Sequence, residues 1–267
     1  MLFQNHFFRL AVVMALMLGS WSAQAEIRSA EEAINVAGRQ RMLSQRMVKA
    51  WLLVGQEVAV ERARRQLDES VALFEEQLSD LEDYIARHKL DTHIRETRSL
   101  WNGFRVALLQ APRRDQAGAL IENGEQLLKS ANQVVTDLEQ TPQGEAERLK
   151  IINLSGRQRM LSQRIALYYS ALAWKAGDAQ VNRERLDQAV SLYESSLNTL
   201  VDSHLNTPEI RAQLARVADH WKFSKAGFQL MESQAFVPFV IQSTTESMLK
   251  RMEAITGLYT GTSGQSR

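Results

Sequence analysis

The sequence INVAGRQRMLSQR at residues 34–46 recurs as INLSGRQRMLSQR at residues 152–164, with 11 of 13 positions identical. Weaker matches follow at a similar spacing: Leu67-Asp68 with Leu186-Asp187, and Trp101 with Trp221. Matches repeated in register over most of the chain indicate an internal duplication. We therefore predict two copies of one unit, at residues 26–142 and 143–260.

Both units are predicted to be helical. Apolar residues recur every three or four positions, as in the series Leu67, Val71, Phe74, Leu78, Leu81 and Ile85, and no stretch alternates as a half-buried strand does. Prolines and candidate N-caps, among them Asp91-Thr92, Asp178 and Thr207, divide the chain further. The predicted helices span residues 29–59, 61–88, 92–111, 115–140, 145–176, 179–205, 208–233 and 239–258. The predicted fold is all-α, with two tandem four-helix-bundle units that we hypothesise pack as a pseudo-dimer within the chain.

The composition excludes several classes of function. With 32 Lys and Arg against 31 Asp and Glu, the chain lacks the basic surplus that nucleic-acid binding requires. It has no cysteine, which excludes disulfides, thiolate metal sites, a cysteine nucleophile and a lipid-modified cysteine. Its five histidines form no Glu-x-x-His or His-Glu-x-x-His motif, and Gly-x-Ser-x-Gly is absent. We therefore predict no enzymatic activity, no metal site and no cofactor.

Residues 1–25 have the pattern of a secretory signal peptide, with Arg9 before an apolar run and Ala23-Gln-Ala25 at the expected cleavage site. No later stretch has the roughly 20 apolar residues that span a bilayer. We therefore expect an exported, soluble protein of the periplasm without a transmembrane segment after cleavage. Residues 261–267, rich in Gly and Ser, are predicted to be a flexible tail.

The repeated motif is retained more strictly than helix packing requires. The 13 residues after each copy match at no position, although a bundle core asks only for apolar side chains of suitable volume. The common stretch GRQRMLSQR holds three arginines and no carboxylate, so its guanidinium groups must find anions elsewhere. Arginine presents a planar fork of donors that suits planar or tetrahedral oxyanions.

Helical geometry separates the arginines within one motif. Arg39 and Arg46 lie on nearly one stripe, whereas Arg41 lies on the stripe expected to pack, about 140° from Arg46. One helix therefore cannot easily aim both at one small anion, but two such helices side by side could. Gly38 and Gly156 are expected where two backbones or a ligand approach closely.

Three interpretations of the arginines remain open at this point. They pair with Asp or Glu on other helices, they form a patch for membrane or nucleic-acid phosphates, or they bind a small anion. Export and the neutral charge disfavour the second interpretation.

The motif at residues 35–46 and its twin resemble the signature of the PilJ-type domain, the N-terminal sensor module of type IV pili methyl-accepting chemotaxis transducers. The motif is also similar to the P-box of nitrate/nitrite-responsive sensor kinases. The resemblance implies four-helix sensor modules whose first helices meet and whose motif arginines bind the anion at the shared interface. The ligand-binding residues that it implies are Arg46 and Arg164 first, then Arg41 and Arg159, with Gly38, Gly156, Arg39 and Arg157 beside them.

The resemblance predicts a sensor that binds a small anion, with nitrate or nitrite as the first candidates, and that signals through a membrane-bound partner protein. The first helix of each copy would supply half of one site. The motif differs from that of the nitrate sensors at Arg39-Gln40, Leu43 and Gln45, which leaves the ligand open. The alternative is an interaction protein whose arginines dock on an acidic surface of a membrane receptor or pilus component, without any small ligand.

Overall fold

A computed structural model of the chain describes residues 26–142, 144–232 and 236–261, and these contain eight α-helices and no strand. They are α2 (Ala30–Gly55), α3 (Val60–His88), α4 (Ile94–Leu108), α5 (Arg114–Glu139), α6 (Ala146–Trp174), α7 (Ala179–Val201), α8 (Pro208–Glu232) and α9 (Pro238–Thr260). The predicted all-α fold of two four-helix units is confirmed. The predicted signal peptide and residues 262–267 of the predicted tail lie outside the described residues. Within the described part, no helix combines the length and the apolarity that crossing a membrane requires.

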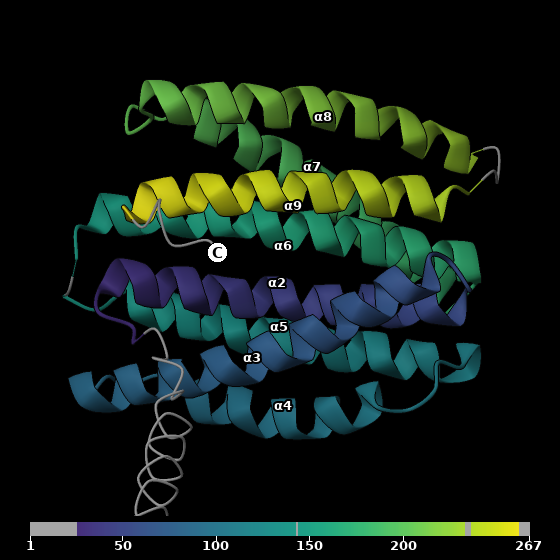
Figure 1. Cartoon of the computed structure of the whole chain (residues 1–267), viewed down its shortest axis with the longest axis horizontal. Helices are drawn as coiled ribbons and strands as arrows, with labels where there is room; N and C mark the ends of the chain where they lie inside the picture. The colour runs from purple at the N-terminus through teal and green to yellow at the C-terminus, as the bar shows by residue number, and fades with distance from the viewer. Residues whose placement is uncertain (1–25, 143, 233–235, 262–267) are drawn as a thin grey trace, which may run out of the picture.

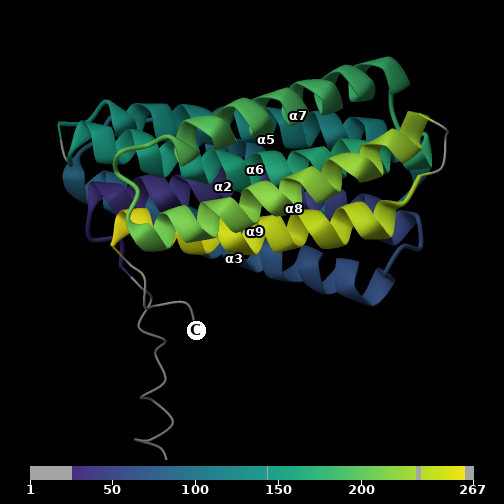
Figure 2. The same ribbon diagram turned by 90° about the horizontal axis from the view of Figure 1, so that it is seen from above.

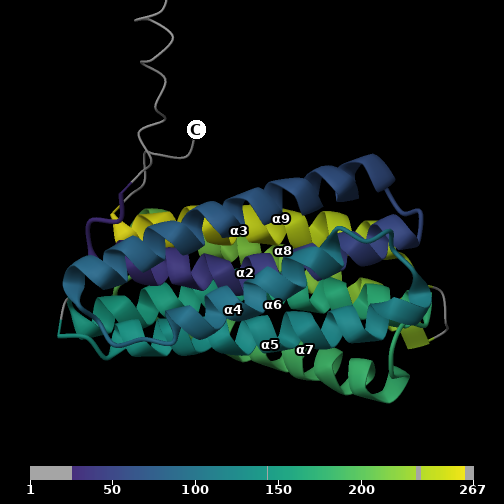
Figure 3. The ribbon, with the colours of Figure 1, turned by 90° about the horizontal axis from the view of Figure 1, so that it is seen from below.

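The two copies of the motif lie on neighbouring helices at the centre of the molecule. Figure 1 shows α2 and α6 side by side and running in the same direction. Each of them is the first helix of its unit. Helices α3 and α5 pack on α2, while α7 and α9 pack on α6. Figure 2 shows helices α7, α8 and α9 on one side, and Figure 3 shows α3, α4 and α5 on the other. The units therefore pack as a pseudo-dimer, with the α2–α6 contact as its most extensive helix pair.

Most predicted helix boundaries agree with the structure to within two residues, and the predicted caps partly account for this. The carboxylate of Asp178 accepts a hydrogen bond from the N–H of Val181 (2.9 Å), and the hydroxyl of Thr207 accepts one from the N–H of Ile210 (3.2 Å). At the predicted Asp91-Thr92 cap, the hydroxyl of Thr92 accepts a hydrogen bond from the N–H of Ile94, the first residue of α4 (3.4 Å), while His93 between them makes no side-chain capping bond.

Three predicted helices extend too far, and of these the one expected over residues 92–111 forms only Ile94–Leu108 of α4. The first was expected to reach residue 59, but α2 ends at Gly55 because Glu57 and Ala59 adopt positive φ angles of 59° and 46°. The sixth was expected to reach residue 205, but α7 ends at Val201, where the side chain of Asn206 donates to the carbonyl oxygens of Leu200 (2.7 Å) and Val201 (3.1 Å). These hydrogen bonds satisfy carbonyl groups that a helix end leaves free.

Equivalent aromatic pairs fill the outer part of each unit. Trp101 on α4 stacks on Phe74 of α3, with 4.2 Å between ring centroids. Trp221 on α8 packs against Tyr193 of α7 at 4.5 Å. All four side chains are buried, so each unit closes its outer helices with the same kind of aromatic contact.

Candidate functional site between α2 and α6

The guanidinium groups of Arg41 and Arg159 lie in the gap between α2 and α6. A Cβ atom at Gly38 would lie 3.3 Å from Nη2 of Arg41 and 3.4 Å from Nη2 of Arg159. A Cβ atom at Gly156 would lie 3.5 Å and 3.1 Å from the same two nitrogens. The two glycines were predicted to permit a close approach, and the groups that approach them are these two side chains.

The hydrogen bonds of the two arginines are reciprocal. Arg41 Nη2 donates to Asn153 Oδ1 on α6 (2.6 Å), and Arg159 Nη2 donates to the carbonyl oxygen of Asn35 on α2 (3.1 Å). Both arginines have 0% of their surface exposed, and the Nε of each has no hydrogen-bond partner among the described residues. The arginine of each motif copy therefore donates a hydrogen bond to the helix that carries the other copy. Its Nε remains a buried donor without a partner among the described residues.

The two arginines differ in their acidic neighbours. Arg159 Nη1 donates to Glu253 on α9 (2.7 Å), and the same carboxylate also pairs with Arg39. At the equivalent place, Arg41 Nη1 donates to the amide oxygen of Asn132 on α5 (2.9 Å). Within the described residues, no carboxylate lies at ion-pair distance from Arg41.

This difference appears in the pKa values. Burial, followed by repulsion from Arg157 and Arg159, lowers the pKa of Arg41 from 12.5 to about 9, and the charge of Glu139 opposes this only in part. Burial also lowers the pKa of Arg159, but there the charge of Glu253 acts against it. Burial would raise the pKa of Glu253, yet the charges of Arg159 and Arg39 outweigh it and lower that pKa to about 2. The buried positive charge of Arg41 is thus poorly compensated.

Arg46 and Arg164, which the resemblance placed first, each have a carboxylate partner in the opposite unit. Arg46 Nη2 lies 3.0 Å from Glu246 on α9, and Arg164 pairs with Glu125 on α5. Of the interpretations left open by the sequence, ion pairing with other helices is thus correct for four arginines: Arg39, Arg46, Arg159 and Arg164. A role of Arg46 and Arg164 in ligand binding remains a prediction.

The other polar residues of the motif stabilise this arrangement. Ser44 Oγ donates to the carbonyl oxygen of Arg41, and Ser162 Oγ to that of Arg159, both at 2.8 Å. Gln158 donates to the carbonyl oxygen of Tyr193 (3.0 Å). Buried polar groups require such partners, which explains why the motif changes less between the copies than an apolar core would.

Sequence reasoning missed a buried charged residue next to the motif. Lys49 has 0% of its surface exposed, and its ammonium group donates to Gln163 Oε1 (2.6 Å) and to Glu246. The corresponding residue of the second copy is Leu167, so this lysine exists in one unit alone. The only indication of this buried lysine in the sequence is that the charged Lys49 aligns with the apolar Leu167.

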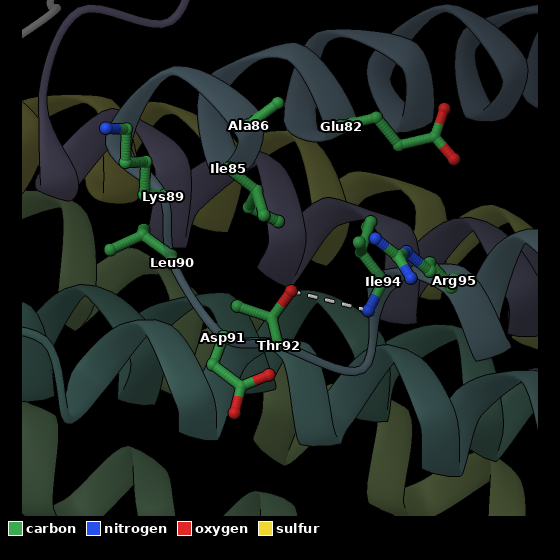
Figure 4. A pocket seen from close by; sticks show the side chains of 9 residues that line it. All are labelled: Glu82, Ile85, Ala86, Lys89, Leu90, Asp91, Thr92, Ile94 and Arg95. Carbon is green, nitrogen blue, oxygen red and sulfur yellow. Dashed lines mark hydrogen bonds between the residues drawn. The ribbon is translucent and has the colours of Figure 1, made fainter.

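A pocket of about 600 Å³ lies away from the motif, at the corner between α3 and α4. Figure 4 shows that it is lined by both apolar side chains and charged ones: Glu82, Ile85, Ala86, Lys89, Leu90, Asp91, Thr92, Ile94 and Arg95. No motif residue contributes to it. Among the described residues, no group of three or more His, Asp or Glu could hold a metal ion.

A family model of the type IV pili methyl-accepting chemotaxis transducer N-terminal domain, PilJ, matches the chain twice, at residues 23–149 and 146–236. The chain belongs to the PilJ family. The first match covers the first unit of the duplication, and the second match covers α6 to α8 and stops before α9. No curated protein and no solved structure matches the chain. Because PilJ domains are the N-terminal domains of chemotaxis transducers, membership fits a role in sensing and signalling.

Proposed function

We propose that this PilJ protein is a periplasmic sensor that binds one small anion in the arginine cluster between α2 and α6 and reports it to a membrane-bound signalling partner. Nitrate and nitrite are the first candidates, because the motif is similar to the P-box of nitrate sensors. The observation that carries the proposal is Arg41, a fully buried guanidinium whose hydrogen bonds go to Asn132 and Asn153 and to no carboxylate.

The energetics favour a bound anion at this place. A buried charge without a counter-ion costs several kcal/mol, and buried charges in proteins are therefore normally paired. Arg41 instead faces two further arginines, Arg157 and Arg159, whose charges lower its pKa. The free Nε atoms of Arg41 and Arg159 add unused donors. A planar oxyanion would supply the missing negative charge and accept such hydrogen bonds.

The position of the cluster suggests how occupancy is reported. Arg41 belongs to α2 of the first unit and Arg159 to α6 of the second, and their contacts hold the two units together. An anion that attracts these guanidinium groups would change their hydrogen bonds across the α2–α6 contact. The relative placement of the two units would then depend on the ligand, and a partner bound to both would detect it.

The docking alternative loses its main support. Arginines that bind an acidic protein surface must be exposed, but Arg41 and Arg159 are fully buried. The side chains of Arg46 and Arg164 are 16% and 12% exposed and already face carboxylates. The motif therefore presents little positive surface to a protein partner.

The test is calorimetric titration with nitrate and nitrite, supported by thermal unfolding with the same anions. An anion at 100 times its Kd should stabilise the wild-type protein by about 2.7 kcal/mol. Arg41→Gln should remove this response while the protein still unfolds cooperatively in the absence of anion, because it removes the charge that the anion would neutralise. The matched control is Arg95→Gln, which removes an exposed arginine from the pocket between α3 and α4 and should respond like wild type. An unchanged response in Arg41→Gln would refute the proposal.

A further inference from the structure

The pseudo-symmetry of the two units is broken at one residue of the arginine cluster. Helices α5 and α9 align with an offset of 121 residues, at which Glu125 corresponds to Glu246 and Leu128-Lys129 to Leu249-Lys250. The same offset places Asn132 opposite Glu253. The contacts agree, since Nη1 of Arg41 donates to Asn132 and Nη1 of Arg159 donates to Glu253.

This substitution leaves one half of the cluster without a carboxylate. On the α9 side, Glu253 receives hydrogen bonds from Arg159 and Arg39. The corresponding arginines on the α5 side are Arg41 and Arg157, and within the described residues neither has a carboxylate at ion-pair distance. Two arginines share one directly bonded carboxylate on the α9 side, whereas on the α5 side the charge of Glu139 acts on Arg41 only from beyond ion-pair distance.

The α5 side is also open to solvent. Arg41 is buried and Arg157 is half-buried, but Asn132 is exposed. Of the two side chains that accept hydrogen bonds from Arg41, Asn132 is exposed and Asn153 is buried, so an anion would approach Arg41 from the side of Asn132. The amide of Asn132 already gives its oxygen to Arg41, which leaves its NH₂ group as a donor for an anion next to it.

We propose that a planar monoanion with the size of a carboxylate binds beside Asn132, between Arg41 and Arg157, in the place that the Glu253 carboxylate has on the other side. This inference rests on the proposed function and makes its site asymmetric. Nitrate, nitrite and small carboxylates such as formate share the required chemistry: one negative charge and two oxygen atoms in the plane of a guanidinium fork. Arg159 is already neutralised, so it contributes less to the affinity than Arg41.

The decisive variant is Asn132→Glu, which supplies the missing carboxylate from the chain itself. We expect it to weaken nitrate binding about 100-fold or more in calorimetric titrations, because the added charge occupies the site and repels the ligand. The variant should also unfold at a higher temperature than wild type without nitrate. The control Asn132→Gln, which keeps the amide, should bind nitrate within about tenfold of wild type, since the local charge is unchanged.

A reciprocal variant keeps the proposal testable if Asn132→Glu fails to fold. Glu253→Gln opens the second half of the cluster, so the number of nitrate ions bound per chain should rise from one to two. Nitrate binding by Asn132→Glu with wild-type affinity would overturn the inference, as would a single nitrate in Glu253→Gln. If Arg41→Gln still loses nitrate in that case, the proposed function stands and only the asymmetric placement is wrong. Absence of nitrate and nitrite binding by the wild-type protein would refute both the proposed function and the asymmetric placement.

Discussion

Glu246 holds together a largely buried ionic cluster next to the motif, and its removal gives a sharp test of the packing between the units. Its carboxylate accepts hydrogen bonds from Arg46 and from Lys49, whose side chain is 0% exposed. Burial raises the pKa of Glu246, but the charges of Lys49 and Arg46 outweigh it and lower the pKa to about 2. Glu246→Gln would leave both cations without a counter-ion.

The size of the effect follows from the pKa values. A fall from the ordinary value of 4.5 to about 2 corresponds to about 3 kcal/mol, at 1.36 kcal/mol for each pKa unit. The folded state binds the proton of Glu246 less readily than the unfolded chain does, so this stability is complete above pH 4.5 and is lost as the pH falls towards 2. Breaking a buried pair typically costs about 3–5 kcal/mol, which agrees.

The assay is urea unfolding followed by circular dichroism between pH 7 and pH 2.5. Glu246→Gln should lower the free energy of unfolding at pH 7 by about 3–5 kcal/mol, and its difference from wild type should shrink below pH 4.5. The matched control is Glu125→Gln, which removes the carboxylate partner of Arg164; beside Arg164, Leu167 stands at the position that corresponds to Lys49, and the expected cost is about 1–2 kcal/mol. Adding Lys49→Leu to Glu246→Gln should restore part of the loss.

Two results would refute this reasoning. Equal costs for Glu246→Gln and Glu125→Gln would show that the buried lysine does not set the magnitude. A difference between wild type and Glu246→Gln that stays constant down to pH 2.5 would show that the carboxylate is not held in its charged form by Lys49 and Arg46.

Two further predictions concern glycines. Gly55→Ala should lower the free energy of unfolding in urea by about 1–3 kcal/mol, because its Cβ would overlap the Trp174 ring, where Cζ2 lies at 2.7 Å. In contrast, Gly103→Ala should raise the free energy of unfolding by up to about 1 kcal/mol, because a Cβ atom there meets open space. A Gly55→Ala variant more stable than Gly103→Ala would contradict the packing. Gly156→Ala should weaken nitrate binding about tenfold in calorimetry, since its Cβ would lie 3.1 Å from Arg159 Nη2 and displace the guanidinium. An unchanged affinity for nitrate would place the anion away from the glycines.

Most of the fold was predictable because its signals are local. Apolar spacing, prolines and side-chain caps such as Asp178 each act within one helix, and they located all eight helices. The early end of α2 was not predictable, because Ala59 adopts a left-handed conformation that sequence rules reserve for glycine. The end of α7 depends on Asn206, a capping residue that binds backwards onto the preceding helix.

The candidate site was predictable in its motif but not in its partners. The helical stripe correctly placed Arg41 on the packed face, yet that face turned out to be the contact between the units, where Arg41 meets Arg159. The acidic partners lie on α5 and α9, whose sequences have diverged and whose offset differs from that of the motif. The offset of 121 residues that pairs Asn132 with Glu253 rests on few matches, and their contacts with Arg41 and Arg159 show that the two positions are equivalent.

Binding of one anion per chain between α2 and α6 can be measured as the stoichiometry of nitrate binding to the full chain in calorimetry. We expect one nitrate for each wild-type chain and none for Arg41→Gln. Two nitrates for each wild-type chain would contradict this expectation by showing that the two motifs act as independent sites. Binding that persists in Arg41→Gln would contradict it by placing the anion outside this cluster.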